Sequence, residues 1–232
     1  MPTRRSPTPL LLGALLLLPL AAAGCAFVEP SPATRIMGPP PPTVGYRATQ
    51  VMEINGRRYT GEVYAMPGVK RLEMPTAGDQ TVVSVVRYDE GMTVSWLGDT
   101  EIAGEMPVGH FGVDLRSPNH VAFDSEAVGP DRVDGLEATK YAYTAAALGG
   151  ATSEGAFWLT PENIVVRLEA VQTTPDAGDP RWVVMTLENL QIGPQDPSLF
   201  EPPPGATFTP LPDLRGYDGF LKNLFGISRR RR

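Results

Sequence analysis

Two histidine–aspartate pairs are the residues whose types and spacing could do chemistry. His110 and Asp114 have the same spacing as His120 and Asp124. A histidine oriented by a carboxylate is a general base, and two such pairs could hold a metal ion. The spacing also arises by chance, and Pro118 argues against one continuous helix through both pairs. The sequence has no G-x-S-x-G or H-E-x-x-H motif and no phosphate-cradling glycine loop. We therefore expect no catalysis, no metal and no cofactor.

The composition limits the classes of function further. The chain has 232 residues, one cysteine and a formal net charge of −6. A single cysteine excludes an internal disulfide framework and a cysteine-based metal cluster. An acidic chain lacks the concentrated basic face that nucleic-acid binding requires, so we expect no nucleic-acid partner. Hydrophobic residues make up 42% of the chain, which is enough for a packed core.

The amino terminus has the three parts of a secretory signal peptide. Arg4 and Arg5 provide positive charge, residues 10–20 form an apolar run, and small residues follow. We expect residues 1–24 to be removed, which lowers the net charge of the mature chain to −8 because two arginines are lost. The alternative is an uncleaved membrane anchor over the uncharged residues 10–28, which the proline at position 19 disfavours.

The end of this signal predicts a lipid anchor. The stretch Ala22-Ala23-Gly24-Cys25 resembles the lipobox of bacterial lipoproteins, although Leu is favoured where Ala22 stands. The resemblance implies a diacylglycerol on the sulfur of Cys25 and a protein held on a membrane that faces the envelope space. Ala26 follows, where Asp would resemble a signal for retention in the inner membrane. We expect the periplasmic side of the outer membrane of a Gram-negative bacterium.

Proline-rich segments flank the central part of the chain. Residues 30–42 contain six prolines and are typical of a semi-rigid extended spacer. We expect the lipidated cysteine and its tether over residues 25–45, one folded domain over residues 46–210 and a tail over residues 211–232. The tail has apolar residues at helical spacing and ends in four arginines, so it could contact an anionic membrane, a partner protein or its own domain, or fray in solvent.

The pattern of the central part is that of strands, with alternating apolar residues and turn dipeptides such as Asn55-Gly56 and Glu90-Gly91. We expect a short helix over Pro118–Val128, capped by Ser117. Successive short strands with local turns predict a mainly β, antiparallel sheet that closes, stacks or curves around something. The expected strands are Tyr46–Ile54, Arg57–Met66, Val69–Met74, Gln80–Asp89, Met92–Leu97, Ala138–Ala147, Ser153–Thr160, Ile164–Val171 and Arg181–Ile192.

Several of these pieces resemble the lipoprotein-localisation-factor (LolA/LolB-like) group, in particular its periplasmic lipoprotein branch. In the order of the family, they are Arg71–Met74 with Val82–Tyr88, Val133–Tyr141, Gly155–Thr160 with Ile164–Glu169, and Leu187–Gly193 running into Asp196–Pro203. The resemblance implies a single curved antiparallel half-barrel with a short helical lid over an apolar concave side. It implies binding of the acyl chain of a lipid or lipoprotein, as carrier or acceptor.

The candidate residues for such a cavity are apolar and aromatic. Each of them has the alternative of being ordinary core. A second function is left open, namely a non-catalytic scaffold that binds another envelope protein through its outer surface. The cavity candidates are Val83, Val85, Met92, Val94, Trp96, Tyr141, Tyr143, Ile164, Val166 and Leu168.

Overall fold

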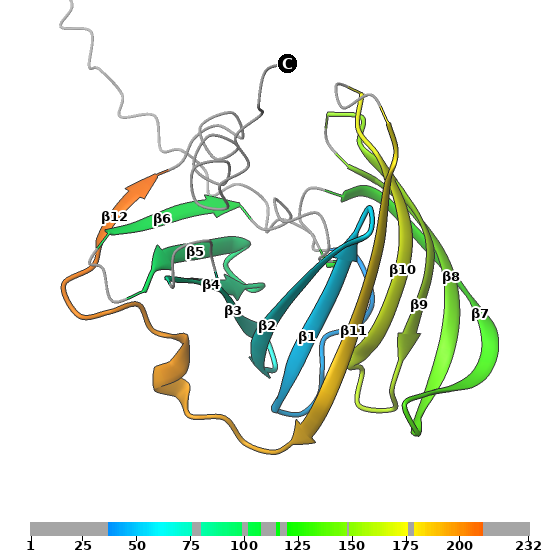
Figure 1. Ribbon diagram of the computed structural model, residues 1–232, viewed down its shortest axis with the longest axis horizontal. Helices are drawn as coiled ribbons and strands as arrows, with labels where there is room; N and C mark the ends of the chain where they lie inside the picture. Colours follow the sequence, from blue (N-terminus) through cyan, green and yellow to red (C-terminus); the bar gives the residue numbers. More distant parts are fainter. Residues whose placement is uncertain are drawn as a thin grey trace, which may run out of the picture. The chain divides into compact units, whose positions relative to one another are not determined.

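The computed structural model describes residues 37–75, 80–98, 102–107, 115–116, 120–147, 149–175 and 179–210. The predicted signal peptide, Cys25, the tail, His110 and Asp114 lie outside these residues. The described residues form twelve strands and one 3-10 turn (Figure 1). These elements are β1 (Tyr46–Ile54), β2 (Arg57–Met66), β3 (Val69–Pro75), β4 (Thr81–Arg87), β5 (Met92–Leu97), β6 (Ile102–Pro107), β7 (His120–Val133), β8 (Leu136–Ala147), β9 (Thr152–Leu159), β10 (Val165–Thr173), β11 (Arg181–Ile192), η1 (Pro197–Phe200) and β12 (Thr207–Pro210).

The strands belong to one open, curved sheet, so the expected mainly β fold is confirmed. Its order is β12-β6-β5-β4-β3-β2-β1-β11-β10-β9-β8-β7. Neighbours along the chain are mostly neighbours in the sheet, and the pairing of β1 with β11 joins the early strands to the late ones. All pairs are antiparallel except β12 with β6, which makes the sheet mixed rather than purely antiparallel.

Short hairpin turns set the register of neighbouring strands. Asn55 and Gly56 both have positive φ, 49° and 75°, as a two-residue type I′ turn requires. The β7–β8 hairpin has the same arrangement at Asp134 and Gly135, with φ of 49° and 84°. The backbone twist of such turns matches the twist of the strands, so the pairs they join begin in a defined register.

Two expectations about helices need correction. The helix predicted for Pro118–Val128 is wrong, because the described residues from His120 onward form β7 and pair with β8. The part of the chain that the structure describes also holds no helical lid, and its one helical turn, η1, packs near β3. Among the same residues, no helix is long and apolar enough to cross a membrane.

Candidate functional site

The two faces of the sheet differ in what they carry. Cross-strand pairs place Phe157, Leu168, Met185 and Met52 in one row across β9, β10, β11 and β1. We call the face that carries this row the inner face and the opposite one the outer face. Because side chains alternate along a strand, the pairing of strands assigns each remaining paired residue to one of these two faces.

Aromatic rings cluster on the inner face of β7, β8 and β9. Tyr141 stacks on Phe157 with ring centres 5.1 Å apart, and Phe123 stacks on Tyr143 at 5.8 Å. The ring of Phe157 is only 1% exposed. The Tyr143 hydroxyl is within 2.7 Å of the Ser153 hydroxyl, and burial raises the pKa of that tyrosine. These rings form one end of a continuous apolar surface.

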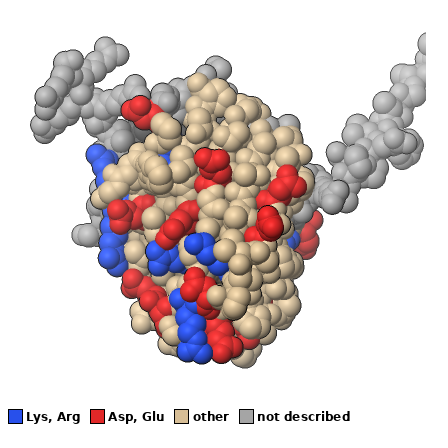
Figure 2. Space-filling view, turned by 90° about the vertical axis from the view of Figure 1, so that its right-hand side faces the viewer, with Lys and Arg blue, Asp and Glu red and all other residues tan. Residues whose placement is uncertain are grey.

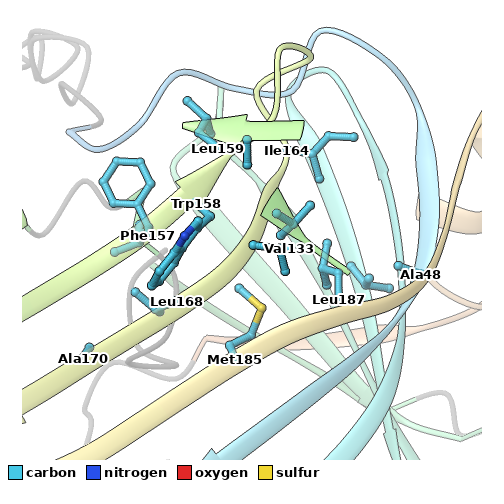
Figure 3. Packing of buried hydrophobic residues seen from close by; sticks show 14 of the residues in the cluster. Ala48, Val133, Phe157, Trp158, Leu159, Ile164, Leu168, Ala170, Met185 and Leu187 are labelled. Atoms are coloured by element: carbon cyan, nitrogen blue, oxygen red, sulfur yellow. The ribbon is translucent and has the colours of Figure 1, made fainter. Parts of the chain in front are cut away.

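Aliphatic side chains continue that surface across β10, β11 and β1. Leu168, Val183 and Leu187 are all buried. Figure 3 shows Met185 and Leu187 pointing to the same side of β11, in the same neighbourhood as Leu168. Together with the aromatic rings, they give the sheet a wide apolar inner face.

The outer face of β7 to β11 carries charged side chains beside exposed apolar ones, among them Trp182 and Val184 of β11. Figure 2, which views the side where these strands lie, shows acidic and basic side chains interspersed. Lys140 and Arg167 lie over the Trp158 ring at 4.8 and 5.3 Å, and the indole nitrogen donates a 2.7 Å hydrogen bond to Asp131. That hydrogen bond lowers the pKa of Asp131.

The outer face of β3 to β6 carries a second, smaller apolar cluster. Val85 and Trp96 pack there with Phe200 of η1. The Arg71 guanidinium lies 5.5 Å from the Trp96 ring and donates a hydrogen bond to the carbonyl of Leu199 at 2.5 Å. The turn η1 therefore covers part of this cluster.

An irregular segment, residues 37–45, packs along the inner face, and we call it the strap. The Arg116 guanidinium donates a 2.6 Å hydrogen bond to the carbonyl of Pro39, which is buried. The Thr43 amide donates a 2.9 Å hydrogen bond to the carbonyl of Glu162. A Cβ atom on Gly38 would lie 2.2 Å from the carbonyl oxygen of Leu115, so only glycine fits this approach. The final residues of the predicted tether thus contact the domain.

A half-enclosed cavity of about 70 Å³ lies beneath the strap. This volume is about half that of an apolar cavity that holds benzene, roughly 150 Å³, and pockets for drug-sized ligands start at about 300 Å³. An acyl chain therefore does not fit in this cavity while the strap is in place. The cavity is lined by Pro39, Pro40, Pro42, Tyr46, Gln50, Lys70, Tyr88, Leu115, Arg116, Asn163, Val165, Met185 and Leu187.

The ten predicted cavity residues do not share one face, which corrects the grouping made from the sequence. Tyr141, Tyr143, Ile164, Val166 and Leu168 belong to the cluster of the inner face. The remaining five are on the outer face of β4 and β5. Ser84 of β4 pairs with Leu72, and Leu72 pairs with Val63 of the inner face. Ser84 therefore belongs to the inner face, and the residues on either side of it, with their partners in β5, belong to the outer face. These five are Val83, Val85, Met92, Val94 and Trp96.

The described histidine–aspartate pair does not come together. The His120 ring stacks on Phe123 at 6.0 Å, and Phe123 pairs with Ala145 on the inner face. The next residue, Asp124, points to the outer face. Among the residues that the structure describes, no group of three His, Cys, Asp or Glu side chains could hold a metal ion.

Sequence reasoning missed three parts of this site. Gln50 lies on the inner face of a strand whose bounds were predicted, but nothing in the sequence distinguishes it from other polar strand residues. Phe123 was assigned to a helix. The strap was read as spacer because its prolines favour an extended backbone, and an extended backbone also packs well on a sheet.

The sequence matches no protein-family model and has no significant relative among curated proteins. Solved structures are similar in fold. A LolA superfamily protein of Nitrosomonas europaea is 6% identical, with a TM-score of 0.40, 69% of this chain covered and 91% of that chain. MucB, in the Pseudomonas aeruginosa MucA/MucB complex, is 17% identical, with a TM-score of 0.41 and 71% of this chain covered, which spans 58% of that chain. The lipoprotein LppX of Mycobacterium tuberculosis is 14% identical, with a TM-score of 0.31 and coverages of 62% and 85%.

Proposed function

We propose that this protein is a lipid-anchored envelope lipoprotein that binds an acyl chain on the inner face of its sheet, as carrier or acceptor. The anchor is the diacylglycerol on Cys25, and the site is the periplasmic side of the outer membrane. The observation that carries the proposal is the continuous apolar inner face, which is covered along one part by an irregular strap.

The energetics favour such a ligand. An acyl chain of about sixteen carbons gains roughly 12 kcal/mol in gross transfer energy, at about 0.8 kcal/mol per buried methylene. Hydrogen bonds from Arg116 to Pro39 and from the Thr43 amide to Glu162 hold the strap to segments outside the strands, and Val44 packs against the core of the inner face. A charged hydrogen bond contributes about 1.5–3 kcal/mol net. A ligand that replaces the strap on the apolar surface can therefore gain more free energy than these hydrogen bonds contribute.

A direct test is native mass spectrometry of the full-length protein, purified in detergent from a Gram-negative envelope. We expect a non-covalent mass that organic extraction removes and that matches a lipid. Cys25→Ser should lose the covalent anchor and its membrane attachment but keep this mass. A protein with no added mass, unchanged after incubation with phospholipid and palmitate, would falsify the proposal.

Two adjacent residues of β1 provide a matched pair of variants. Met52 lies on the inner face and Val51 on the outer face, and both are half-buried. Met52→Gln places an amide on the proposed ligand path, whereas Val51→Gln makes the same kind of change on the opposite side. We expect only the first variant to lose bound lipid.

The second candidate function is a scaffold that binds another envelope protein. The small cavity, about 70 Å³, favours it, because a scaffold keeps its core filled. Equal lipid content in both variants, together with retention of a protein partner from detergent extracts, would support the scaffold instead.

A further inference from the structure

The strap is the segment that connects the proposed lipid anchor to the sheet. β1 begins at Tyr46, directly after the strap, and residues 26–36 separate the strap from Cys25. While the strap is docked, Gly38 is fixed against the backbone of Leu115. The chain from Cys25 to Gly38 spans at most about 45 Å, whatever its conformation. Docking of the strap therefore limits the distance between the anchor and this point of the domain.

The start of the strap is held by two local contacts. Gly38 packs on the backbone of Leu115, and the buried Pro39 accepts the hydrogen bond from Arg116. Leu115 and Arg116 belong to a short described segment outside the strands. These two contacts therefore open without any strand leaving the sheet.

The end of the strap continues into the sheet. The Gly45 carbonyl accepts a 2.9 Å hydrogen bond from the Gly193 amide, next to the pair of Tyr46 and Ile192 that begins the ladder between β1 and β11. Gly45 therefore stays beside the sheet when the strap leaves the inner face. The chain that is freed extends from Gly38 to this point.

Prolines make the freed strap a spacer of defined length. Residues 39–42 are four consecutive prolines, which have no backbone N–H and therefore donate no hydrogen bond that release would break. In solvent, such a run favours an extended polyproline conformation and acts as a semi-rigid spacer. At about 3.1 Å per residue, the chain from Gly38 to Gly45 then adds about 22 Å to the tether.

We propose that docking of the strap limits how far the domain moves from its lipid anchor, and that a ligand on the inner face removes this limit. The inference rests on the proposed function. Pro39 and Pro40 line the same small cavity as Met185 and Leu187 of the inner face, so the strap and an acyl chain compete for one surface. Such competition is a coupling free energy that acts in both directions. The empty domain is held near its membrane, and the loaded domain reaches about 22 Å further.

The test measures the height of the domain above a bilayer by energy transfer. The full-length protein, lipidated at Cys25, is placed in phosphatidylcholine vesicles with an acceptor dye on the headgroups and palmitate added. Cys25 is the only cysteine, so Glu126→Cys on the edge strand β7 provides a single free thiol for the donor dye. We expect less transfer in this labelled protein than in the same protein with Met52→Gln, because the mean height differs by up to about 22 Å. Val51→Gln should match the protein without it.

The strap is also tested without a ligand. In the Met52→Gln background, Gly38→Ala should lower the transfer efficiency because it displaces the strap, and Gly129→Ala should leave it unchanged. If Met52→Gln does not fold, palmitate titration of the otherwise unchanged labelled protein decides, since its transfer efficiency should fall as bound palmitate rises.

Native mass spectra of the same proteins separate the two proposals. Bound lipid in the wild type with a transfer efficiency that does not depend on it would overturn this inference and leave the proposed function standing. A wild type that carries no lipid, even after addition of palmitate, would overturn both.

Discussion

Gly38→Ala is the substitution that tests most directly whether the strap is a fitted part of the domain. The added Cβ would lie 2.2 Å from the carbonyl oxygen of Leu115 and 2.8 Å from the Cα of Arg116. These are backbone atoms, so the strap must move rather than a flexible side chain. The backbone at Gly38 also has a φ of +138°, which alanine adopts only with strain.

Gly129→Ala is the matched control. Its φ is +149°, and a Cβ there has no neighbour within 4 Å. Both variants are expected to lose about 1–3 kcal/mol of unfolding free energy through backbone strain. Gly38→Ala should lose a further 1.5–3 kcal/mol or so, because displacement of the strap breaks the charged hydrogen bond from Arg116 to Pro39.

Thermal unfolding and dye binding measure the two consequences. For a domain of this size, 1 kcal/mol shifts Tm by about 2–4 °C, so Gly38→Ala should melt roughly 3–12 °C below Gly129→Ala. The displaced strap should also increase binding of a fluorescent apolar dye by the folded protein. Equal Tm values and equal dye binding in the two variants would refute the assignment of the strap as a fitted cover.

Two further predictions concern the two faces. Phe157→Ala should destabilise the domain by about 3–5 kcal/mol in urea unfolding, because its ring is fully buried, whereas Trp182→Ala, 67% exposed, should stay within about 0.5 kcal/mol; similar losses would contradict the assigned burial. The hydrogen bond from Trp158 lowers the pKa of Asp131, so the unfolded state binds the proton more readily and stability is lost as the pH falls from about 5 towards 2. Asp131→Asn should flatten that loss, and an unchanged acid slope would rule out this contribution.

Three of the strands whose bounds the sequence predicted, β1, β2 and β5, have turns with positive φ at one end or at both. The bounds of β1 and β2, on either side of Asn55-Gly56, agree with the prediction, as do those of β5 and β11. A turn that needs positive φ at defined residues leaves little freedom for where a strand ends. For β1, β2 and β5, the turn residues are therefore enough to predict where the strand ends.

The missed strands depend on partners far away in the sequence. β6 contains Ala, Gly, Glu and Pro, which are poor strand formers, and it exists because it pairs with both β5 and β12. β7 is an edge strand with two bulges, and its charged residues and proline are typical of an exposed edge. Periodicity along the chain does not contain these pairings.

The split of the ten cavity candidates has the same origin. Alternation shows which residues of one strand share a face, but it does not say which face of the next strand lies beside them. In β4, five consecutive residues from Val82 to Val86 are buried, so alternation itself gives no answer there. The register decides it, since Ser84 pairs with Ser95 and Leu72 and thereby places Val83 and Val85 outside.

The difference between strap and sheet bears on how a ligand could enter. Residues of the strands between the two edges are held by ladders of backbone hydrogen bonds on both sides, so they open only with a large part of the domain. The strap has isolated hydrogen bonds, such as those to Pro39 and from Thr43, and segments of this kind open locally at a fraction of the global free energy. The strap can therefore leave the inner face while the sheet that would bind the ligand stays folded. A helix packed in the same place by an apolar stripe would be harder to displace, so an irregular cover is compatible with the ligand site that we propose.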